Sequence, residues 1–234
     1  GNAFGDAGHR VVNEEFLQGE EASYICMVDG ENILPMATSQ DHKARDEGDR
    51  GPNTGGMGAY SPAPVVSDEI AERVMNEVIR PTVAGMAAEG ARYVGFLYAG
   101  LMIDAEGTPK VLEYNCRFGD PETQPIMMRL QSDLVAHCLA ALEGRLDQEL
   151  AEWDSRASLG VVLAAKGYPD AYARGEVIRN IPPETPASKV FHAGTAFNDA
   201  GEVVSNGGRV LCAVALGKDI REAQQQVYRM VDQI

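Results

Sequence analysis

The sequence predicts an α/β protein of the α+β type, with a larger domain over residues 1–152 and a smaller, mixed β-sheet domain over residues 153–234. Two observations predict this division. Strand-like and helix-like segments are mixed before Trp153, whereas short apolar strands followed by one helix make up the rest. The 234 residues are 44% hydrophobic, which is enough to bury one large core or two modest ones.

The first domain is expected to open with strands and turns. Residues 11–17 and 21–28 carry strand patterns, and the first of these would need partner strands from upstream. Turn residues at 29–32 predict that residues 33–38 return as the hairpin partner of 21–28. The polar segment 39–60 is predicted to be a loop.

Cap residues predict two helices in the first domain. Ser67, followed by two acidic residues, predicts a helix start, and Gly90 predicts its end. Asp133 and Gly144 bound a further helix in the same way. Between these helices two strands are expected, at residues 95–103 and 110–115.

Short apolar strands characterise the second domain. Asn206-Gly207 is a strong signal for a two-residue turn, which predicts a hairpin of 202–205 with 209–216. Asp219 predicts the N-cap of a final helix, because apolar residues recur at helical spacing after it. Two further strands are expected at residues 159–165 and 190–197.

Composition excludes several classes of protein. Twenty Lys and Arg against thirty-five Asp and Glu give a net charge of −15, which repels nucleic-acid backbones and argues against a nucleic-acid partner. No apolar run approaches the length of a membrane span and no signal peptide opens the chain, so a cytoplasmic protein is predicted, with no membrane partner. The four cysteines are scattered and read as reduced, mostly buried residues.

Three polar residues alternate along the strand expected at 110–115 and just beyond it. Glu113, Asn115 and Arg117 would share one face, while Leu112 and Tyr114 would face the core. Carboxylate and amide oxygens suit Mg²⁺, and a guanidinium can neutralise a phosphoryl group. The alternative is an edge strand with a solvated polar face. The unusually specific run that follows, up to Pro125, favours the functional interpretation.

Two other segments are candidates for chemistry. Residues 51–58, Gly-Pro-Asn-Thr-Gly-Gly-Met-Gly, have a backbone that could approach a ligand or present N–H groups to an anion, although they form no Walker A motif. Glycine content alone slightly favours a flexible surface loop. Residues 41–43, Asp-His-Lys, offer a cation or form a solvated turn. Acidic residues at 14–15 and 20–21 are solvated in the simplest reading, although one could hold ribose hydroxyls.

An ordered set of motifs resembles one family. Residues 14–21, 37–43, 51–62, 95–100 and 113–124 are together similar to the phosphoribosylamine–glycine ligases, also called glycinamide ribonucleotide synthetases. The last of these runs Glu-Tyr-Asn-Cys-Arg-Phe-Gly-Asp-Pro-Glu-Thr-Gln. The resemblance continues through residues 159–166, 189–195 and 205–211 and so covers nearly the whole chain. It implies an ATP-grasp catalytic domain over 1–152 and a glycinamide ribonucleotide synthetase C-terminal domain over 153–234.

The resemblance implies a reaction of de novo purine biosynthesis. ATP would phosphorylate the carboxylate of glycine, and the amine of 5-phosphoribosylamine would displace the phosphate to give glycinamide ribonucleotide. The cofactors would be ATP and Mg²⁺ or Mn²⁺, and the full-length enzyme would be a monomer. Positioning and charge stabilisation would supply the catalysis, without a nucleophilic side chain.

The resemblance also implies roles for individual residues. The metal ligands would be Glu113 and Asn115. Arg117 would face the phosphoryl group, Lys43 would reach a phosphate, and Asp120 would line the pocket for glycine and phosphoribosylamine. That pocket would also include Asn53, Gly55, Gly56 and Gly58. The nucleotide would lie against a hinge of Glu14, Glu15, Phe16 and Leu17, with Glu21 near the ribose.

The chain departs from the family pattern at its start. Gly1 is not an initiator Met, and the N-terminal Rossmann-like domain and most of the ATP lid are expected to be missing, so the piece alone is expected to be inactive. Asn13 stands where the family pattern has an aliphatic residue. One alternative is another ATP-grasp ligase, which would keep Glu113, Asn115 and Arg117 but not the segments 51–62 and 118–124. The other is a non-enzymatic metal-binding module.

Overall fold

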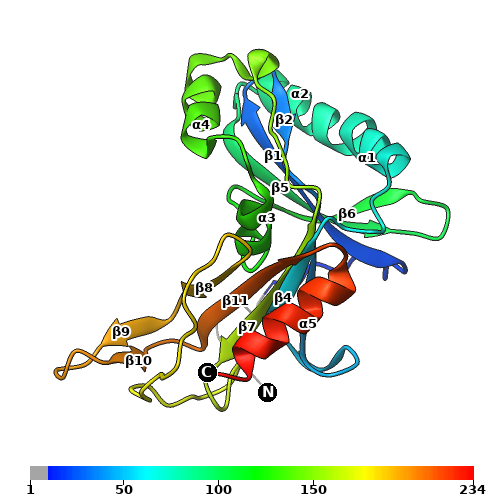
Figure 1. Ribbon diagram of the computed structural model, residues 1–234. Coiled ribbons are helices and arrows are strands. Elements are labelled where there is room, and N and C mark those ends of the chain that lie inside the picture. The colour runs from blue at the N-terminus through cyan, green and yellow to red at the C-terminus, as the bar shows by residue number, and fades with distance from the viewer. Residues whose placement is uncertain (1–9) are drawn as a thin grey trace.

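Two antiparallel sheets organise the protein in the computed structural model, which describes residues 10–234 (Figure 1). The first sheet has the strand order β2-β1-β5-β6 and the second the order β3-β4-β7-β11-β8. The strands of the first sheet are β1 (Glu20–Asp29), β2 (Ile33–Pro35), β5 (Val94–Ile103) and β6 (Pro109–Asn115). Those of the second are β3 (Gln40–Asp46), β4 (Arg50–Ser61), β7 (Ala157–Ala164), β8 (Ser188–His192) and β11 (Arg209–Gly217). A separate pair joins β9 (Thr195–Phe197) to β10 (Val203–Ser205).

The first sheet is buried on both faces. Alternate residues of β1 point to opposite sides, so Cys26 and Val28 belong to one apolar cluster and Ile25 and Met27 to another. The first cluster is covered by one continuous helical rod and the second by α3 and α4, on the two sides seen in Figure 1. The rod comprises α1 (Asp68–Val74), a π-helical segment (Met75–Ile79) and α2 (Arg80–Ala88). The other helices are α3 (Thr123–Arg129) and α4 (Leu134–Glu143), followed by a short 3-10 helix (Leu146–Gln148).

The second sheet packs against α5 (Ile220–Val231) on one face and against α3 on the other. Ala223, Val227 and Met230 form the buried stripe of α5, which the helical spacing of apolar residues predicts. Capping follows the sequence closely, because Asp219 accepts a hydrogen bond from the backbone N–H of Glu222 and Asp133 caps α4 likewise. These local predictions are confirmed.

The predicted loop at residues 39–60 is wrong, because this segment forms the hairpin of β3 and β4. Its glycines serve close packing. A Cβ added to Gly58 would lie 2.7 Å from the carbonyl oxygen of Gly160, on the neighbouring strand β7. The high glycine content of this segment suggested a flexible loop. In the structure, the absence of a side chain at Gly58 lets β4 approach β7 closely.

The predicted hairpin across Asn206-Gly207 is also wrong. β11 lies in the middle of its sheet, where β7 and β8 occupy both of its edges, so β10 pairs with β9 instead. Gly194, between β8 and β9, packs tightly against Gly207, between β10 and β11. This contact brings the two connections together. Residues 11–17 form no strand, and Val11 and Phe16 are each 86% exposed.

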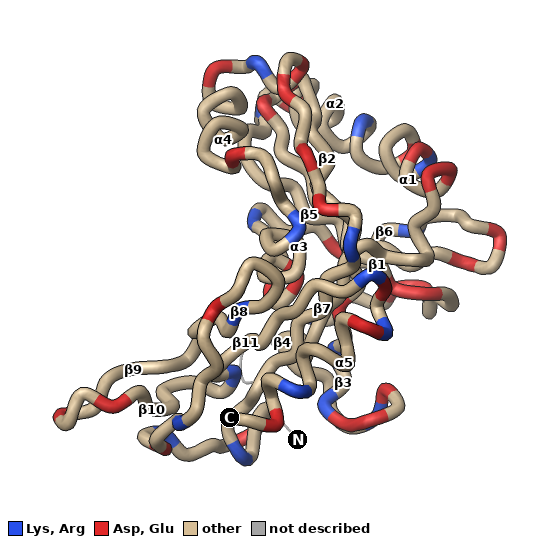
Figure 2. The backbone as a smooth tube through the Cα atoms, viewed as in Figure 1, with Lys and Arg blue, Asp and Glu red and all other residues tan. Residues whose placement is uncertain are grey.

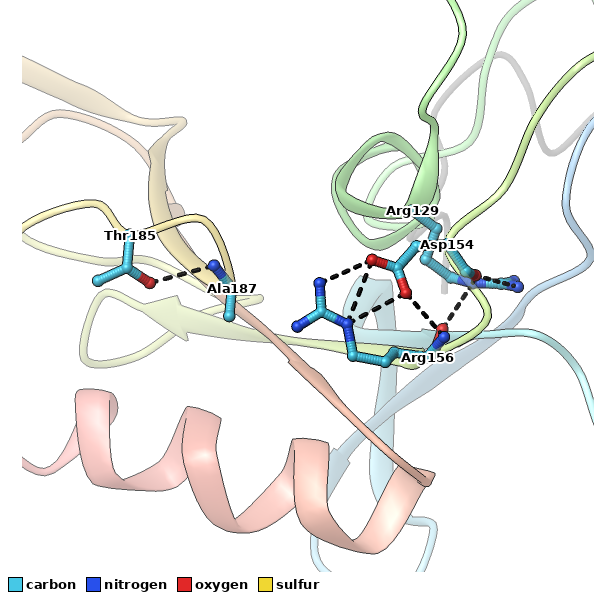
Figure 3. Close-up of polar contacts among 5 residues, drawn as sticks. All are labelled: Arg129, Asp154, Arg156, Thr185 and Ala187. Carbon is cyan, nitrogen blue, oxygen red and sulfur yellow. Dashed lines mark hydrogen bonds and ion pairs between the residues drawn. The ribbon is translucent and has the colours of Figure 1, made fainter.

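The predicted domain boundary near residue 152 remains a prediction, but it does not separate the sheets. β3 and β4 precede it in sequence and join β7, β8 and β11, which follow it. Arg129 of α3 links residues on both sides of this boundary, since its guanidinium donates to the backbone carbonyls of Asp154 and Arg156 (Figure 3). It also donates to Ser61 Oγ. Asp154 in turn pairs with the guanidinium of Arg156 at 2.7 Å. The two halves of the sequence therefore share one framework.

Candidate active site

A cavity of about 170 Å³ lies where β6, the β3–β4 hairpin and the turn after β6 meet. Its wall is mostly polar. The lining residues are Asp41, Lys43, Thr54, Gly55, Tyr98, Glu113, Asn115, Arg117, Asp120 and Glu122. A neighbouring cavity of about 240 Å³ shares Asp41, Lys43, Tyr98 and Glu113 with it. Because they share part of their walls, the two cavities together make up the candidate site.

The structure brings the three alternating residues together, since Glu113, Asn115 and Arg117 all line the smaller cavity. Glu113 lies opposite Gly100 on β5, where a Cβ would come within 3.2 Å of the Glu113 side chain, so the glycine makes room for it. The expectation that Leu112 and Tyr114 face the core is wrong, because they are 36% and 43% exposed. β6 is an edge strand with a register shift in its pairing to β5, which interrupts the regular alternation.

The cationic residues of the site have different surroundings. Lys43 Nζ lies 3.1 Å from Glu21 Oε2, with both side chains partly exposed. The phosphate role predicted for Lys43 and the ribose role predicted for Glu21 therefore fall on one ion pair. Arg117 donates to the carbonyl of Phe118 at 2.8 Å and pairs with no carboxylate among residues 10–234. Its guanidinium is exposed at the cavity and available to an anion.

Arg209 joins the glycine-rich strand to the turn at Asp120. One guanidinium nitrogen donates to the carbonyls of Gly55 at 2.7 Å and Asp120 at 3.0 Å, and the other lies 2.9 Å from Asp120 Oδ2. Gly56 has φ +112° and packs against Pro121, so this part of β4 requires glycine. Sequence reasoning assigned no role to Arg209, although it lies in the motif at 205–211. Nothing local in the sequence reveals its partner at Asp120.

Two acidic residues of the cavity wall, Asp41 and Glu122, also went unassigned. Glu122 is 1% exposed and accepts a hydrogen bond from Ser23 Oγ at 2.8 Å, and Ser23 Oγ in turn lies 3.0 Å from the hydroxyl of Tyr98. The second carboxylate oxygen of Glu122 has no hydrogen-bond partner within residues 10–234. Burial, together with the charge of Glu122, raises the pKa of Asp41 to about 6. The sequence signals near these two residues were the candidate segment 41–43, which contains Asp41, and the acidic run Asp120-Pro-Glu122.

Other predicted site residues lie elsewhere. Glu14, Glu15, Phe16 and Leu17 line neither cavity, and Glu15 lies 3.6 Å from Lys110 on the outer strand β6. Asn53 and Gly56 are also outside the lining. Gly58 borders a different groove, of about 770 Å³, beside α5. The roles predicted for these residues remain predictions.

Within residues 10–234 no cluster of three or more His, Cys, Asp or Glu side chains could hold a metal ion by itself. The predicted metal ligands are one carboxylate and one amide on β6. This set suits a hard cation that takes its remaining ligands from phosphates and water. No helix in the described part of the chain is long and apolar enough to span a membrane. Figure 2 shows basic and acidic residues interspersed along the chain.

Family models match both parts of the chain. The model described as phosphoribosylglycinamide synthetase, ATP-grasp (A) domain, matches residues 1–123, and the model of the C domain of the same synthetase matches residues 158–234. The chain belongs to the phosphoribosylglycinamide synthetase family. The family predicted from the sequence motifs is thereby confirmed, and the first part of the chain is an ATP-grasp domain.

Relatives named phosphoribosylamine–glycine ligase agree with the family. Those of Vibrio cholerae and Yersinia pestis are 69% and 66% identical over 100% of this chain, which covers 54% and 55% of their lengths. The chain therefore spans about half the length of these relatives. The crystal structure of phosphoribosylamine–glycine ligase from Thermotoga maritima is 39% identical with a TM-score of 0.85, over 94% of this chain and 54% of that one.

More distantly related structures share this fold. A biotin carboxylase from Campylobacter jejuni, solved as a complex with a nucleotide described as β-γ-ATP, shares 14% identity and has a TM-score of 0.65. It matches 94% of this chain and 47% of its own length. At this identity the likeness shows the fold alone.

We predict that Asp41→Asn stabilises the protein at pH 8 and not at pH 4. A carboxyl with a raised pKa contributes most stability when protonated, below about pH 4, and loses that contribution as the pH rises through about 6. The amide does not titrate, so the variant should gain about 1–2 kcal/mol over the wild type at pH 8. Urea unfolding across this pH range measures the difference. Asp199→Asn, an exposed control, should show none; equal stability of Asp41→Asn and wild type at pH 8 would contradict the assignment.

We predict that Arg209→Lys loosens the glycine-rich strand. A lysine ammonium cannot make the forked contacts to Gly55 and Asp120 together, so unfolding free energy should fall by about 1.5–3 kcal/mol. Amide exchange at residues 53–57 should accelerate. Arg179→Lys is the control, because its contact to Glu202 is 3.9 Å long and 70% of the Arg179 side chain is exposed. Unchanged exchange in Arg209→Lys would show that Arg209 does not hold the strand.

Proposed function

We propose that this protein carries the catalytic site for ATP- and Mg²⁺-dependent ligation of glycine to 5-phosphoribosylamine, through a glycyl phosphate. The products are glycinamide ribonucleotide, ADP and phosphate. The observation that carries this proposal is that Glu113, Asn115, Arg117 and Lys43 all line one cavity, in a chain of this family. The names of the relatives supply the two substrates.

The alternatives from the sequence now have less support. Membership of the family argues against a different ATP-grasp ligase. A non-enzymatic module would have no reason to place beside two metal-type ligands in a cavity a guanidinium that pairs with no carboxylate of residues 10–234. Action as a monomer in the cytoplasm remains part of the proposal.

The residues present fit a magnesium–nucleotide complex. Glu113 and Asn115 offer two oxygen ligands on one face of β6, and Mn²⁺ accepts the same donors. A bound divalent cation would neutralise phosphate charge and hold the phosphates in line for transfer. Lys43 lies at the junction of the two cavities, where its ammonium can leave Glu21 for a phosphate oxygen.

The remaining residues position the two substrates. Arg117, free of an acidic partner in the described chain, faces the same cavity and can stabilise the negative charge on the phosphoryl group and then on the acyl phosphate. Asp120 and Gly55, fixed by Arg209, form another part of the cavity wall. The amine of phosphoribosylamine is itself the nucleophile, so no side chain has to attack.

The function is tested with protein expressed from the whole reading frame. Glycine-dependent release of phosphate in the presence of ATP, Mg²⁺ and phosphoribosylamine, with glycinamide ribonucleotide as the product, is the expected result. Binding is tested separately by thermal shift, where a specific nucleotide at a hundredfold excess over its dissociation constant adds about 2.7 kcal/mol. ATP should stabilise the protein and GTP should not. Phosphate release that is independent of glycine would contradict the proposal.

We predict that Glu113→Gln abolishes most activity and leaves stability nearly unchanged. The side chain is exposed at the cavity and packs in no core, so unfolding free energy should change by less than about 0.5 kcal/mol. Turnover at saturating Mg²⁺ and ATP should fall strongly, because one metal ligand loses its charge. The control is Glu106→Gln, in the turn that precedes the same strand. A normal rate in Glu113→Gln would remove Glu113 from the metal site.

We predict that Arg117→Lys lowers turnover more than tenfold, which corresponds to about 1.4 kcal/mol or more in the activation barrier. Lysine keeps the charge but lacks the planar fork that can bridge two phosphoryl oxygens. Steady-state kinetics compare it with Arg221→Lys, an exposed position on α5. If the Arg117 variant turned over normally, its guanidinium would have no role in phosphoryl transfer.

A further inference from the structure

The connection between β7 and β8 is a part of the chain to which the proposed reaction assigns no role. Its first section, residues 165–175, lies along the segment that leads into β11. The backbone N–H of Ala165 donates to the carbonyl of Gly208 at 2.7 Å, and that of Gly175 donates to the carbonyl of Ser205 at 2.7 Å. These bonds hold both ends of residues 165–175 beside the residues that precede Arg209.

Two tyrosine rings of residues 165–175 pack against Gly208. A Cβ added at Gly208 would lie 2.4 Å from Cδ2 of Tyr168 and 3.0 Å from Cε1 of Tyr172. The two ring centroids are 6.3 Å apart. Since a side chain at position 208 would displace both rings, the glycine provides the surface on which they lie. This packing gives the Tyr168 ring a fixed direction.

The hydroxyl of Tyr168 reaches the wall of the candidate active site. Its oxygen accepts a hydrogen bond from the backbone N–H of Gly55 at 3.1 Å. The carbonyl of the same glycine accepts a hydrogen bond from Arg209 at 2.7 Å. Gly55 lines the smaller cavity. Both backbone polar groups of this wall residue are therefore held by side chains from residues 158–234, the part of the chain that matches the C-domain model.

Gly55 has little of its own to hold it in place. It has no side chain, it is exposed, and a glycine backbone can adopt many conformations. Thr54 ties the neighbouring residues to β3, since its hydroxyl donates to the carbonyl of Lys43 at 2.9 Å and accepts from the N–H of Gly56 at 3.0 Å. The two contacts from the second half of the chain hold Gly55 itself. Catalysis by positioning requires that such a wall moves little.

We propose that Tyr168 is a positioning residue for the ligation, an inference that rests on the proposed function. Its hydroxyl acts through the backbone of Gly55 rather than on a substrate. Arg209 contacts both Gly55 and Asp120, so a displaced Gly55 also disturbs the wall at Asp120. The proposed metal ligands belong to a different element, β6, so the binding of MgATP does not depend on Tyr168.

The test compares Tyr168→Phe with the wild type in protein expressed from the whole reading frame. Loss of the hydroxyl leaves the Gly55 N–H to water, so kcat for glycine-dependent phosphate release should fall about three- to tenfold, the effect of one hydrogen bond. The KM for MgATP should change less than about twofold. The melting temperature should stay near that of the wild type, because the ring still packs on Gly208.

Tyr172→Phe is the matched control, because it removes a hydroxyl from the same loop and Gly55 donates to Tyr168 instead. It should keep the wild-type kcat.

Two further measurements separate positioning from a general effect on folding. Amide exchange at Gly55 should accelerate in Tyr168→Phe and stay at the wild-type rate in Tyr172→Phe. The kcat of the double variant, Tyr168→Phe with Arg209→Lys, should fall by less than the product of the two single losses, because both side chains hold the same residue.

A normal kcat in Tyr168→Phe, beside an active wild type, would overturn the positioning role, and so would an equal loss in Tyr172→Phe. Unchanged amide exchange at Gly55 would also overturn it, as would a double variant whose loss equals the product of the two single losses. A wild type that releases no phosphate in response to glycine would instead overturn the proposed function, and the positioning role with it.

Discussion

The candidate site depends on the pairing of β4 with β7, which joins strands from the two halves of the chain into one sheet. Gly58 lies against the carbonyl of Gly160 so closely that a side chain at position 58 would force the strands apart. This pairing fixes the β3–β4 hairpin over the end of β6. Lys43 and Asp41 from β3 and Gly55 from β4 thereby reach the cavity that Glu113 and Asn115 line from the other sheet.

Arg209 extends this constraint from the backbone to the site. It enters from the start of β11, where the sheet has already brought the second half of the chain beside β4. Its contacts to Gly55 and Asp120 tie the glycine-rich strand to the turn that follows β6. A site whose walls come from separate elements needs such a link, because catalysis by positioning tolerates little displacement of the groups that hold the substrates.

Local signals predicted those parts of the fold that local interactions determine. The cap at Asp133, the cap and apolar stripe of α5, and the hairpin of β1 with β2 each depend on residues close in sequence. The alternation of Glu113, Asn115 and Arg117 likewise predicted that these residues lie together, and all three line one cavity. The structure of segment 39–60 was not predicted, because its glycines allow close packing against β7, which is about a hundred residues away in sequence. The contacts of Arg209 and Glu122 were not predicted for the same reason, since their partners Asp120 and Ser23 are distant in the sequence.

The cavity contains a buried carboxylate, that of Glu122, which neither the sequence motifs nor the fold predicts. Packing alone would favour an apolar residue at position 122, since an uncompensated buried carboxylate destabilises the folded state. The same charge raises the cost of ionising Asp41, so the free protein holds two carboxylates in a mutually unfavourable arrangement.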